Sequence, residues 1–395
     1  MTTTLIIGSG VAAWTLAREL RKASPEQRLI MVTQDSGDFY SKPMLSNALA
    51  SGKNPENLVM TPAARLADMQ KVELHTHTRV LAIQPAAKTV QVCPHTQAEH
   101  SAHATLPYDH LVIATGADPT RLPMQGTGAA HVLSVNDLTD YAAFRQTLTG
   151  KHTVAVLGAG LIGCEFANDL LKANLVPVVF DVAHRALARL LPQEASVFLE
   201  NRLSQAGVRW KLGTTITHID KTSQGYLLTD AQGATTPADL VLSAVGLTPR
   251  TKLAQQAGLH CERGLVTDKF GCTSNPHIYA LGDCAQYHGQ HVLPYIMPIM
   301  QAARALAKTL SGQPTPIHFP AMPVTVKTPD CPTVVCPPQP DLAGTWETEA
   351  TESGVKSLFK THTGELLGMA LLGDAVQERQ TLAALLPPLQ PTTEN

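Results

Sequence analysis

Two stretches of the chain share one pattern of apolar and polar positions: an apolar run, a glycine-rich turn and then helical periodicity. The first stretch covers residues 5–22 and the second covers residues 154–172. A short apolar run that meets a glycine turn before a helix is typical of a nucleotide-binding strand–turn–helix unit. We therefore interpret the two stretches as an internal repeat of that unit, and not as a short solenoid repeat.

The glycine turns have the sequences GSGVAA at 8–13 and GAGLIG at 158–163. Gly10 and Gly160 carry no side chain, which lets the backbone approach a pyrophosphate. The helix N-terminus behind each turn offers free N–H groups and a partial positive charge to that anion. Ala13 replaces the third glycine of the first turn, which the pattern tolerates. The turn residues that we expect to bind a dinucleotide are Gly8, Gly10, Ala12, Ala13, Gly158, Gly160, Leu161, Ile162 and Gly163.

A second apolar strand follows each unit and ends at an acid. The first strand ends near Asp35 and the second at Asp181, each about 20 to 25 residues beyond its glycine turn, where a ribose-binding carboxylate belongs. Gln34 is an alternative to Asp35 for this role. Because Asp181 would also repel a 2′-phosphate, it favours NADH over NADPH. We expect the neighbouring His184 and Arg185 to offset part of that repulsion.

The segment 273–285 contains a further strand that ends in Gly282 and Asp283. We expect Asp283 to hold a hydroxyl of the ribityl chain of FAD. An amphipathic helix is expected over 297–308, with Pro298 in its first turn, where proline is tolerated. If the N-terminus of this helix faces the flavin pyrimidine, its dipole stabilises the negative charge on reduced flavin.

The order of these elements predicts an α/β fold. Two further apolar strands that end in glycine turns lie at 111–116 and 240–246, and from about residue 319 the chain becomes rich in proline and short strand-like pieces. We expect two Rossmann-like dinucleotide-binding domains, the second inserted into the first, and a small C-terminal α+β domain. The expected ranges are 1–110 and 243–318 for the FAD-binding domain, 111–242 for the NAD-binding domain and 319–395 for the C-terminal domain.

Composition and charge narrow the choice of partners. Hydrophobic residues make up 44% of the 395 residues and charged residues 16%, which is a globular composition with a substantial core. The formal net charge of -2 gives no reason to expect nucleic acid or an anionic membrane as a partner. No apolar run reaches the roughly 20 residues of a membrane helix, and the N-terminus lacks a signal-peptide pattern. We therefore expect a cytoplasmic protein.

The cysteines offer little for metal or redox chemistry. The seven cysteines include no C-x-x-C pair, which argues against zinc knuckles, Cys-ligated clusters and thioredoxin chemistry. Cys331 and Cys336 are close in sequence, but prolines surround them and we expect them to be unpaired. Reduced, scattered cysteines fit a cytosolic protein, and no metal site is expected.

Five motifs occur in a telling order: GSGVAA, ATGADP, GAGLIGCEFA, SAVGLTPRT and TSNPHIYALGDCA. Over residues 3–309 they resemble the pyridine-nucleotide flavoprotein reductases of the glutathione-reductase fold. Two narrower segments, 40–46 and 322–329, together with GAGLIGCEFANDL, resemble the bacterial rubredoxin reductases, a family of NADH-linked enzymes of alkane hydroxylation. With these segments the resemblance extends over nearly the whole chain.

The resemblance implies FAD and NADH as cofactors. It places Lys42 and Pro43 beside the isoalloxazine and Glu165 near the nicotinamide. It also brings Lys327 near the flavin from the C-terminal domain, with an ordinary surface lysine as the alternative. Glu165 and Lys327 are therefore the catalytic candidates. The other residues expected to contact a cofactor are Val80, Ala114, Thr115, Gly116, Arg185, Val245, Gly246, Gly282 and Met297.

The sequence also departs from parts of the wider family. No cysteine precedes Cys93, so the redox cysteine pair of the disulfide reductases is excluded. The single cysteine of the peroxidase branch is missing from 42–45. Asn47 stands where many ferredoxin reductases of oxygenase systems carry a lysine, which puts a lysine–glutamate pair with Glu165 in question.

We therefore expect a flavoprotein that passes electrons from NADH through FAD, one at a time, to rubredoxin, in support of an alkane hydroxylase system. Without a cysteine pair, electrons must leave from the flavin edge, so the carrier must dock close to it. The alternative enzyme is an NADH:ferredoxin reductase of an oxygenase system. A non-catalytic flavoprotein like the apoptosis-inducing-factor relatives is disfavoured, because the insertions and targeting segments of those proteins are missing.

Overall fold

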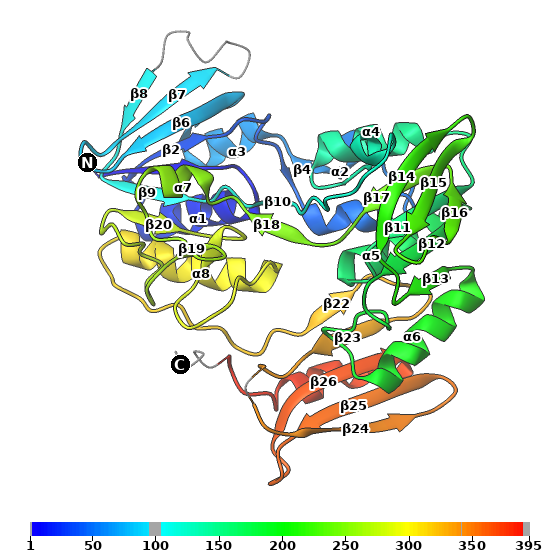
Figure 1. Ribbon diagram of the computed structural model, residues 1–395. Helices are drawn as coiled ribbons and strands as arrows, with labels where there is room; N and C mark the ends of the chain where they lie inside the picture. The colour runs from blue at the N-terminus through cyan, green and yellow to red at the C-terminus, as the bar shows by residue number, and fades with distance from the viewer. Residues whose placement is uncertain (1, 95–103, 341, 390–395) are drawn as a thin grey trace.

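The computed structural model describes residues 2–94, 104–340 and 342–389, and Figure 1 shows the chain arranged around three main sheets. Two of these sheets are parallel and belong to dinucleotide-binding domains, and the third is antiparallel. The expected α/β class with a C-terminal α+β domain is confirmed. Residues 341 and 390–395 of the expected C-terminal range lie outside the described residues.

The first domain contains a five-stranded parallel sheet in the order β20-β9-β1-β2-β5. Two helices, α1 (Val11–Ala23) and α8 (Ile296–Leu310), pack side by side on one face of this sheet (Figure 1). The three-stranded meander β6-β7-β8 lies on the other side. The strands are β1 (Thr3–Ile7), β2 (Arg28–Val32), β5 (Val72–His75), β6 (Thr78–Gln84), β7 (Thr89–Pro94), β8 (Ala104–Pro107), β9 (His110–Ile113) and β20 (Ile278–Ala280).

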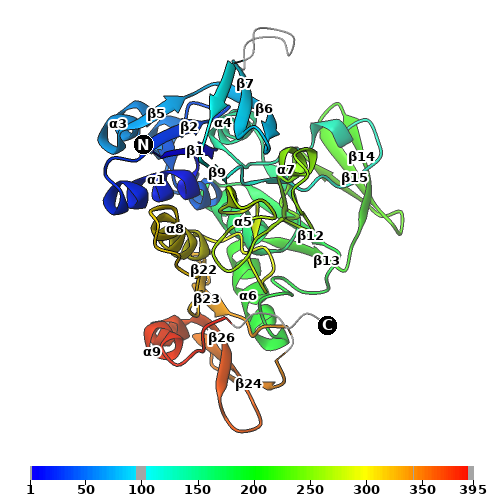
Figure 2. The same ribbon diagram turned by 90° about the vertical axis from the view of Figure 1, so that its left-hand side faces the viewer.

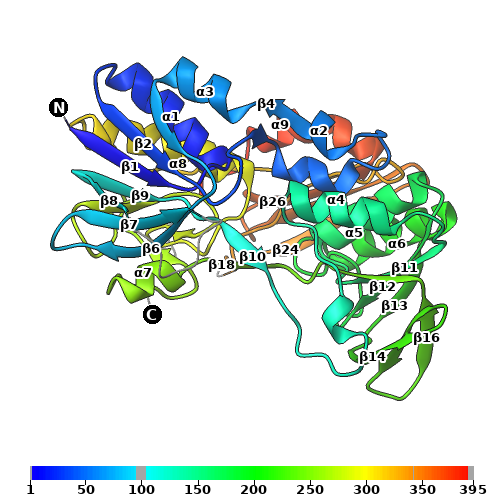
Figure 3. The same ribbon diagram turned by 90° about the horizontal axis from the view of Figure 1, so that it is seen from above.

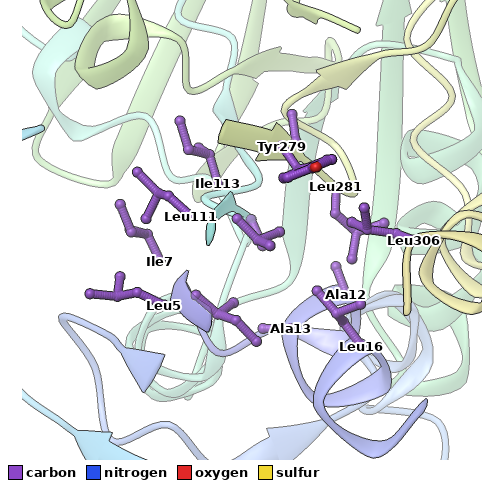
Figure 4. Packing of buried hydrophobic residues seen from close by; sticks show 14 of the residues in the cluster. Leu5, Ile7, Ala12, Ala13, Leu16, Leu111, Ile113, Tyr279, Leu281 and Leu306 are labelled. Carbon is purple, nitrogen blue, oxygen red and sulfur yellow. The ribbon is translucent and has the colours of Figure 1, made fainter. Parts of the chain in front are cut away.

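The apolar side chains of this sheet form the first core. A parallel strand covered on both faces is expected to read as a continuous apolar run, and the last four residues of β1 are all buried. Figure 4 shows β1, β9 and β20 packed against the two helices. The side chains labelled there are Leu5, Ile7, Ala12, Ala13, Leu16, Leu111, Ile113, Tyr279, Leu281 and Leu306.

The second domain contains a four-stranded parallel sheet in the order β13-β12-β11-β17. Helix α5 (Leu161–Lys172) follows the second glycine turn, and a separate meander β14-β15-β16 packs on the sheet through Ile219 and Leu228. The remaining elements are α4 (Leu138–Thr147), β11 (Thr153–Leu157), β12 (Val176–Asp181), α6 (Gln193–Ala206), β13 (Arg209–Leu212), β14 (Ile216–Thr222), β15 (Gly225–Asp230), β16 (Thr235–Ala238) and β17 (Leu240–Ser243).

Two short antiparallel strands join these domains: β10 (Ala117–Pro119) and β18 (Leu247–Pro249). Figure 3 shows this pair lying between the two parallel sheets. The expected boundary at residue 111 is wrong, because β9 pairs with β1 and β20 inside the first sheet. The apolar run and glycine turn of 111–116 resemble the start of a new unit, but the run supplies a central strand of the first domain. The chain crosses to the second domain only after that strand.

The C-terminal domain is a five-stranded antiparallel sheet in the order β22-β23-β26-β25-β24. Helix α6 of the second domain packs against β25 and β26 (Figure 2). The elements are β22 (Val324–Val326), β23 (Thr333–Cys336), β24 (Thr345–Ala350), β25 (Gly354–Lys360), β26 (Leu366–Gly373), η3 (Asp374–Glu378) and α9 (Arg379–Ala383).

A second core spans the border between the second and C-terminal domains. It joins Phe166 of α5 to Val326, Val335 and Leu372 of the C-terminal sheet. It also takes in Leu45 of the short helix η1 (Lys42–Asn47), which belongs to the first domain. Because one apolar cluster covers all three domains at this point, η1, α5 and β22 are packed as neighbours.

Short elements complete the described chain. They are β3 (Phe39–Tyr40), α2 (Pro55–Leu58), β4 (Val59–Thr61), α3 (Ala63–Gln70), η2 (Ala129–His131), α7 (Lys252–Gln256), β19 (Leu265–Val266) and β21 (Ala285–Gln286). Within the described ranges no helix is both long enough and apolar enough to cross a membrane. Cys331 and Cys336 are both buried and form no disulfide in this structure.

Candidate functional site

A cleft of about 2080 Å³ lies between the first and second domains and is lined by the carboxyl ends of both parallel sheets. Pockets for single small ligands occupy about 300–1,000 Å³, so this cleft has room for two dinucleotides. In doubly wound folds, ligands bind at the carboxyl ends of the strands. Except for Ala13 and Gly163, every residue that the sequence analysis assigns to the site lines this one cleft.

The glycine turns are open toward the cleft and closed behind. A Cβ atom added to Gly10 or Gly160 would meet nothing within 4 Å, and the following helices α1 and α5 have no side-chain cap. Their first N–H groups are therefore available to an anion. By contrast, a Cβ on Gly8, where φ is +113°, would lie 2.3 Å from the Ala114 carbonyl oxygen. These turns fit a dinucleotide pyrophosphate.

Ala13 and Gly163 are the two assigned turn residues that do not line the cleft. Both lie behind their turns, outside the residues that line the cleft, although the sequence pattern assigned them to cofactor binding. A Cβ on Gly163 would be 1.9 Å from the Gly158 carbonyl oxygen, and Ala13 is fully buried. Their small size therefore allows the close packing of helix on turn.

The two strand-end acids brace their own turns. Asp181 accepts hydrogen bonds from the backbone N–H of Ala159 at 2.5 Å and of Ala183 at 2.8 Å. Asp35 accepts from the hydroxyls of Ser9 at 2.9 Å and Thr33 at 2.6 Å. Each carboxylate thus lies beside its glycine turn, at the place where a ribose would reach it.

Only some of the candidate residues near these two acids line the cleft. Gln34, the alternative to Asp35, also lines the cleft. Near Asp181, Arg185 lines the cleft but His184 does not. Arg189 lines it as well, although its position in the sequence gave no signal for this role.

Lys42 and Asp283 form the charged part of the first-domain side. Both line the cleft, Lys42 from η1 and Asp283 just after β20. Burial lowers the pKa of Lys42, while the nearby Asp283 carboxylate opposes that change. Burial raises the pKa of Asp283, and Lys42 opposes it in turn. Two partly desolvated charges that stabilise each other can bind polar groups of a ligand without a large reorganisation.

Helix α8 supplies an open N-terminus to the same region. It begins at Ile296, close to the expected residue 297, with Pro298 in its first turn. Its N-cap, Tyr295, makes no capping hydrogen bond through its side chain, and Met297 lines the cleft with 47% of its surface exposed. The partial positive charge of this helix end therefore faces a place where negative charge can be held.

Glu165 is the most heavily bonded buried acid of the site. It is 1% exposed and lies on α5, five residues beyond Gly160. Its carboxylate accepts from the Ser46 hydroxyl at 2.5 Å and from the Lys327 backbone N–H at 2.9 Å, and it forms an ion pair with the Lys327 ammonium. The lysine–glutamate pair that Asn47 put in question is therefore present, with its lysine supplied by the C-terminal domain.

The position of Lys327 rules out the alternative of an ordinary surface lysine. Its side chain is 22% exposed, is paired with a buried acid and lines the cleft. Ser46 is a partner that the sequence analysis missed. It belongs to the segment 40–46, yet a serine hydroxyl carries no signal that would single it out.

Asp169 is a second acid on α5 that the sequence did not reveal. It is 3% exposed and accepts from the backbone N–H groups of Leu49 at 3.0 Å and Ala50 at 2.7 Å. Burial raises the pKa of Asp169 to about 6, although the two N–H donors lower it. Through this carboxylate, α5 holds the chain that follows η1, and η1 carries Lys42 into the cleft.

The described residues contain no group of three His, Cys, Asp or Glu side chains placed to hold a metal ion. Among the described residues that line the cleft, none is a cysteine. What the described lining does offer is the charged side chains and open helix ends given above.

The fold and the site define a class of protein. The chain matches the pyridine nucleotide-disulphide oxidoreductase family over residues 2–308 and the rubredoxin binding C-terminal domain over residues 316–386. It belongs to the pyridine nucleotide-disulphide oxidoreductase family. This membership confirms the resemblance read from the five sequence motifs.

Among curated relatives, the chain is 44% identical to the rubredoxin-NAD(+) reductase of Acinetobacter baylyi, over 98% of both chains. It is 43% identical to the rubredoxin-NAD(+) reductase of Alcanivorax borkumensis, over 98% of this chain and 99% of the relative. It is also 38% identical to the nitric oxide reductase FlRd-NAD(+) reductase of Aeromonas salmonicida, over 97% of this chain and 96% of the relative.

Solved structures extend the likeness. The ferredoxin reductase for the CYP199A2 system from Rhodopseudomonas palustris superposes with a TM-score of 0.87 at 27% identity, covering 99% of this chain and 96% of that one. The putidaredoxin reductase–putidaredoxin complex gives a TM-score of 0.85 at 25% identity, covering 98% and 94%.

Proposed function

We propose that this chain is an FAD-dependent reductase that takes electrons from NADH and passes them, one at a time, to a rubredoxin. One observation carries the proposal: two open glycine turns meet in a single cleft, and Lys327 enters that cleft from the domain that matches a rubredoxin-binding family. The relatives named rubredoxin-NAD(+) reductase, at 43% and 44% identity, support it.

The first domain would hold FAD. Gly8, Gly10 and the N-terminus of α1 would bind its pyrophosphate, Asp35 its adenosine ribose and Asp283 its ribityl chain. The second domain would hold NADH through Gly158, Gly160 and Asp181 in the same way. The other residues that we propose for cofactor contact, all of which line the cleft, are Ala12, Pro43, Val80, Ala114, Thr115, Gly116, Leu161, Ile162, Arg185, Val245, Gly246, Gly282 and Met297.

When bound, FAD accepts a hydride from NADH and releases the two electrons singly. The residues of the chain would orient the bound cofactors and provide charges around them, and none would form a covalent bond to a cofactor. Lys42, Lys327 and the N-terminus of α8 would stabilise negative charge in the cleft. Glu165 would keep the Lys327 ammonium in place. Since no cysteine of the described chain lines the cleft, no thiol pair relays the electrons.

The test begins with the purified protein, which is expected to be yellow, with one FAD and no iron. Anaerobic stopped-flow mixing with NADH should bleach the flavin absorbance. Mixing the reduced protein with rubredoxin should then restore the colour faster than mixing with a ferredoxin. A colourless protein that cannot be reconstituted with FAD, or a flavin that NADH does not reduce, would contradict the proposal.

The second candidate is an NADH:ferredoxin reductase of an oxygenase system. The superposition with the ferredoxin reductase from Rhodopseudomonas palustris favours it. The same mixing experiment decides between the two, because faster reduction of a ferredoxin than of any rubredoxin would establish this alternative.

We place the protein in the cytoplasm, in support of an alkane hydroxylase system. The cytoplasm supplies NADH and keeps cysteines reduced, which suits a chain without a C-x-x-C pair. The alkane link rests on the sequence resemblance. Cell fractionation tests the location, and growth on an n-alkane after deletion of the gene tests the pathway. Normal growth on alkanes without any related reductase in the cell would remove that link.

A further inference from the structure

Helix α5 presents one face to a single segment of the C-terminal domain. Glu165, Asn168 and Lys172 are spaced three and four residues apart, which puts their side chains on the same side of the helix. All three contact residues 327–330, which follow strand β22. Glu165 binds Lys327 at one end of the segment, and the other two bind Asp330 at its far end.

The contacts around Asp330 form the group that we call the Asp330 cluster, made of Asn168, Lys172 and Asp330. The Asn168 amide donates to Asp330 Oδ2 at 2.6 Å, and the Asp330 backbone N–H donates back to Asn168 Oδ1 at 3.2 Å. The Lys172 ammonium lies 2.6 Å from Asp330 Oδ1.

The contacts of Asp330 with Asn168 and with Lys172 differ in strength. Asn168 is fully buried, so its hydrogen bonds to Asp330 are shielded from water. The side chain of Lys172 is 43% exposed, and an exposed ion pair contributes little. The reciprocal bonding of Asn168 and Asp330 therefore dominates this contact.

Strand β22 on its own holds Lys327 weakly. It has three residues, Val324–Val326, and lies at the edge of the C-terminal sheet, where β23 is its one partner strand among the described residues. Lys327 is the first residue beyond this strand. A compact turn follows, in which the Thr328 hydroxyl donates to the Cys331 carbonyl oxygen at 2.8 Å. Because Asp330 lies within that turn, holding Asp330 fixes the position of Lys327 three residues earlier.

We propose that Asp330 and Asn168 are positioning residues, which hold segment 327–330 on α5 so that the Lys327 ammonium stays on Glu165 at the cleft. The proposal rests on the proposed function, because it assigns Lys327 to the flavin side of the cleft. The proposal also explains why such a contact is needed. In this chain the lysine of the lysine–glutamate pair comes from another domain, so an additional contact must hold it in place, whereas a lysine on a neighbouring helix would need none.

The first test needs no cofactor. The apoprotein is labelled with a trace of acetic anhydride, and mass spectrometry follows Lys327 with Lys360 of the same domain as an internal reference. Wild-type Lys327 should be protected. Asp330→Ala should raise the labelling rate of Lys327 roughly tenfold, as expected for the loss of one charge-assisted hydrogen bond. Asp330→Asn, which keeps an acceptor for Asn168, should restore most of the protection.

A matched control is Arg202→Ala. Arg202 of α6 donates to the Glu352 carbonyl oxygen at 2.8 Å, so its loss loosens the C-terminal domain at a different contact. Labelling of Lys327 should not change in this variant. If Arg202→Ala exposes Lys327 as strongly as Asp330→Ala, or if Asp330→Ala leaves Lys327 protected, the positioning role is wrong.

The second test uses the FAD-loaded protein and a double-mutant cycle. Asp330→Ala alone should slow flavin reduction by NADH and shift the flavin potential in the same direction as Lys327→Met. In the Lys327→Met background, removing Asp330 should change neither value further. Additive losses would mean that Asp330 acts by another route. If NADH does not reduce the wild-type flavin, the proposed function fails, while the labelling result still decides the positioning role.

Discussion

At the scale of single residues, Asp181 is the group that we propose discriminates between NADH and NADPH. Its carboxylate braces the second glycine turn through the Ala159 N–H and lies in the cleft with Arg185 and Arg189. We expect NADH to be preferred over NADPH. Asp181→Ser should remove a repulsion of about 1 kcal/mol or more between the carboxylate and the 2′-phosphate of NADPH. The ratio of kcat/KM with NADH to kcat/KM with NADPH should therefore fall at least about fivefold.

The measurement for Asp181 is steady-state kcat/KM with each dinucleotide. Val182→Ser is the matched control, because Val182 lines the same end of the cleft without a charge and should leave the ratio unchanged. Equal kcat/KM values for NADH and NADPH in the unmutated protein would show that the two arginines outweigh the acid.

Asp283 makes a prediction about FAD retention. If its carboxylate holds a ribityl hydroxyl, Asp283→Ala should weaken FAD binding by about 1.5–3 kcal/mol, the range for a hydrogen bond to a charged group. The dissociation constant should therefore rise by roughly tenfold to a hundredfold. Titration of apoprotein with FAD, followed by flavin fluorescence, measures it. Asp109→Ala, at the opposite end of the first sheet, should have no effect. Unchanged FAD affinity in Asp283→Ala would refute the placement.

The place of Lys327 in the cleft could be predicted from the sequence, but its partner could not. Its segment, with GAGLIGCEFANDL, pointed to a narrow family, and the structure indeed brings Lys327 into the cleft. Its ion pair with Glu165 was not predictable, because 162 residues separate the two in sequence. In addition, Asn47 stands at the position where many ferredoxin reductases carry the lysine. Ser46 and Asp169 were missed for a similar reason. Asp169 binds backbone N–H groups, and such donors leave no mark on residue identity.

At the scale of elements, the strand–turn–helix units could be predicted well because their signals are local. Each combines an apolar run, a turn that needs glycine and helical periodicity within about 20 residues. The helix expected at 297–308 occurs as α8, Ile296–Leu310. The role of α5 as a joint between three domains could not be predicted, since its partners in η1 and in segment 327–330 are determined only by tertiary packing.

The raised pKa of Asp169 predicts how the contact between α5 and η1 responds to pH. The pKa of Asp169 is raised from 3.8 to about 6 in the folded protein, chiefly by burial, with Glu165 adding to the shift and Lys327 opposing it. A raised folded-state pKa means that this group favours the folded state fully below pH 4. That contribution is lost as the pH rises to about 6 and beyond. A shift of about 2 units corresponds to roughly 3 kcal/mol.

Asp169→Asn removes this titration. Relative to wild type, the variant should gain about 3 kcal/mol in free energy of unfolding between pH 4 and pH 7, whatever its absolute stability. Denaturant unfolding of both proteins at several pH values measures the difference. Asp239→Asn is an opposite-sign control, because two backbone N–H groups lower the pKa of Asp239 against the effect of burial. Parallel pH profiles for wild type and Asp169→Asn would refute the shifted pKa.

At the scale of the whole molecule, the two-domain insertion was visible in sequence, but one of its borders was misplaced. The apolar run and glycine turn at 111–116 look like the start of a unit, and only the pairing of β9 with β1 and β20 assigns the strand to the first sheet. A local sequence pattern does not determine the order of strands in a sheet. Apolar runs that end in glycine turns therefore predict that a parallel strand exists, and leave open which sheet receives it.

Charge over the whole molecule governs how a carrier approaches. The formal net charge is -2, so no large basic field draws an acidic carrier from a distance. Within the C-terminal domain, Lys356 is paired with Glu349 and Glu378, and Lys360 with Glu347. Pairing of this kind leaves little unbalanced positive charge on the described part of that domain. Docking should therefore depend on a small patch near the cleft, with apolar contacts at its centre.

The rate of rubredoxin reduction is therefore expected to be only moderately sensitive to salt. Exposed charges are screened beyond about 8 Å at physiological ionic strength, so a small patch should lose roughly tenfold in rate, or less, between low and moderate salt. The measurement is stopped-flow reduction of rubredoxin by the NADH-reduced protein across a series of salt concentrations. A small uncharged electron acceptor serves as the control, because its rate should not depend on salt. A fall of several orders of magnitude with rubredoxin would reveal a strong basic docking surface. No reduction of rubredoxin at any salt, together with rapid reduction of a ferredoxin, would make the ferredoxin the physiological partner.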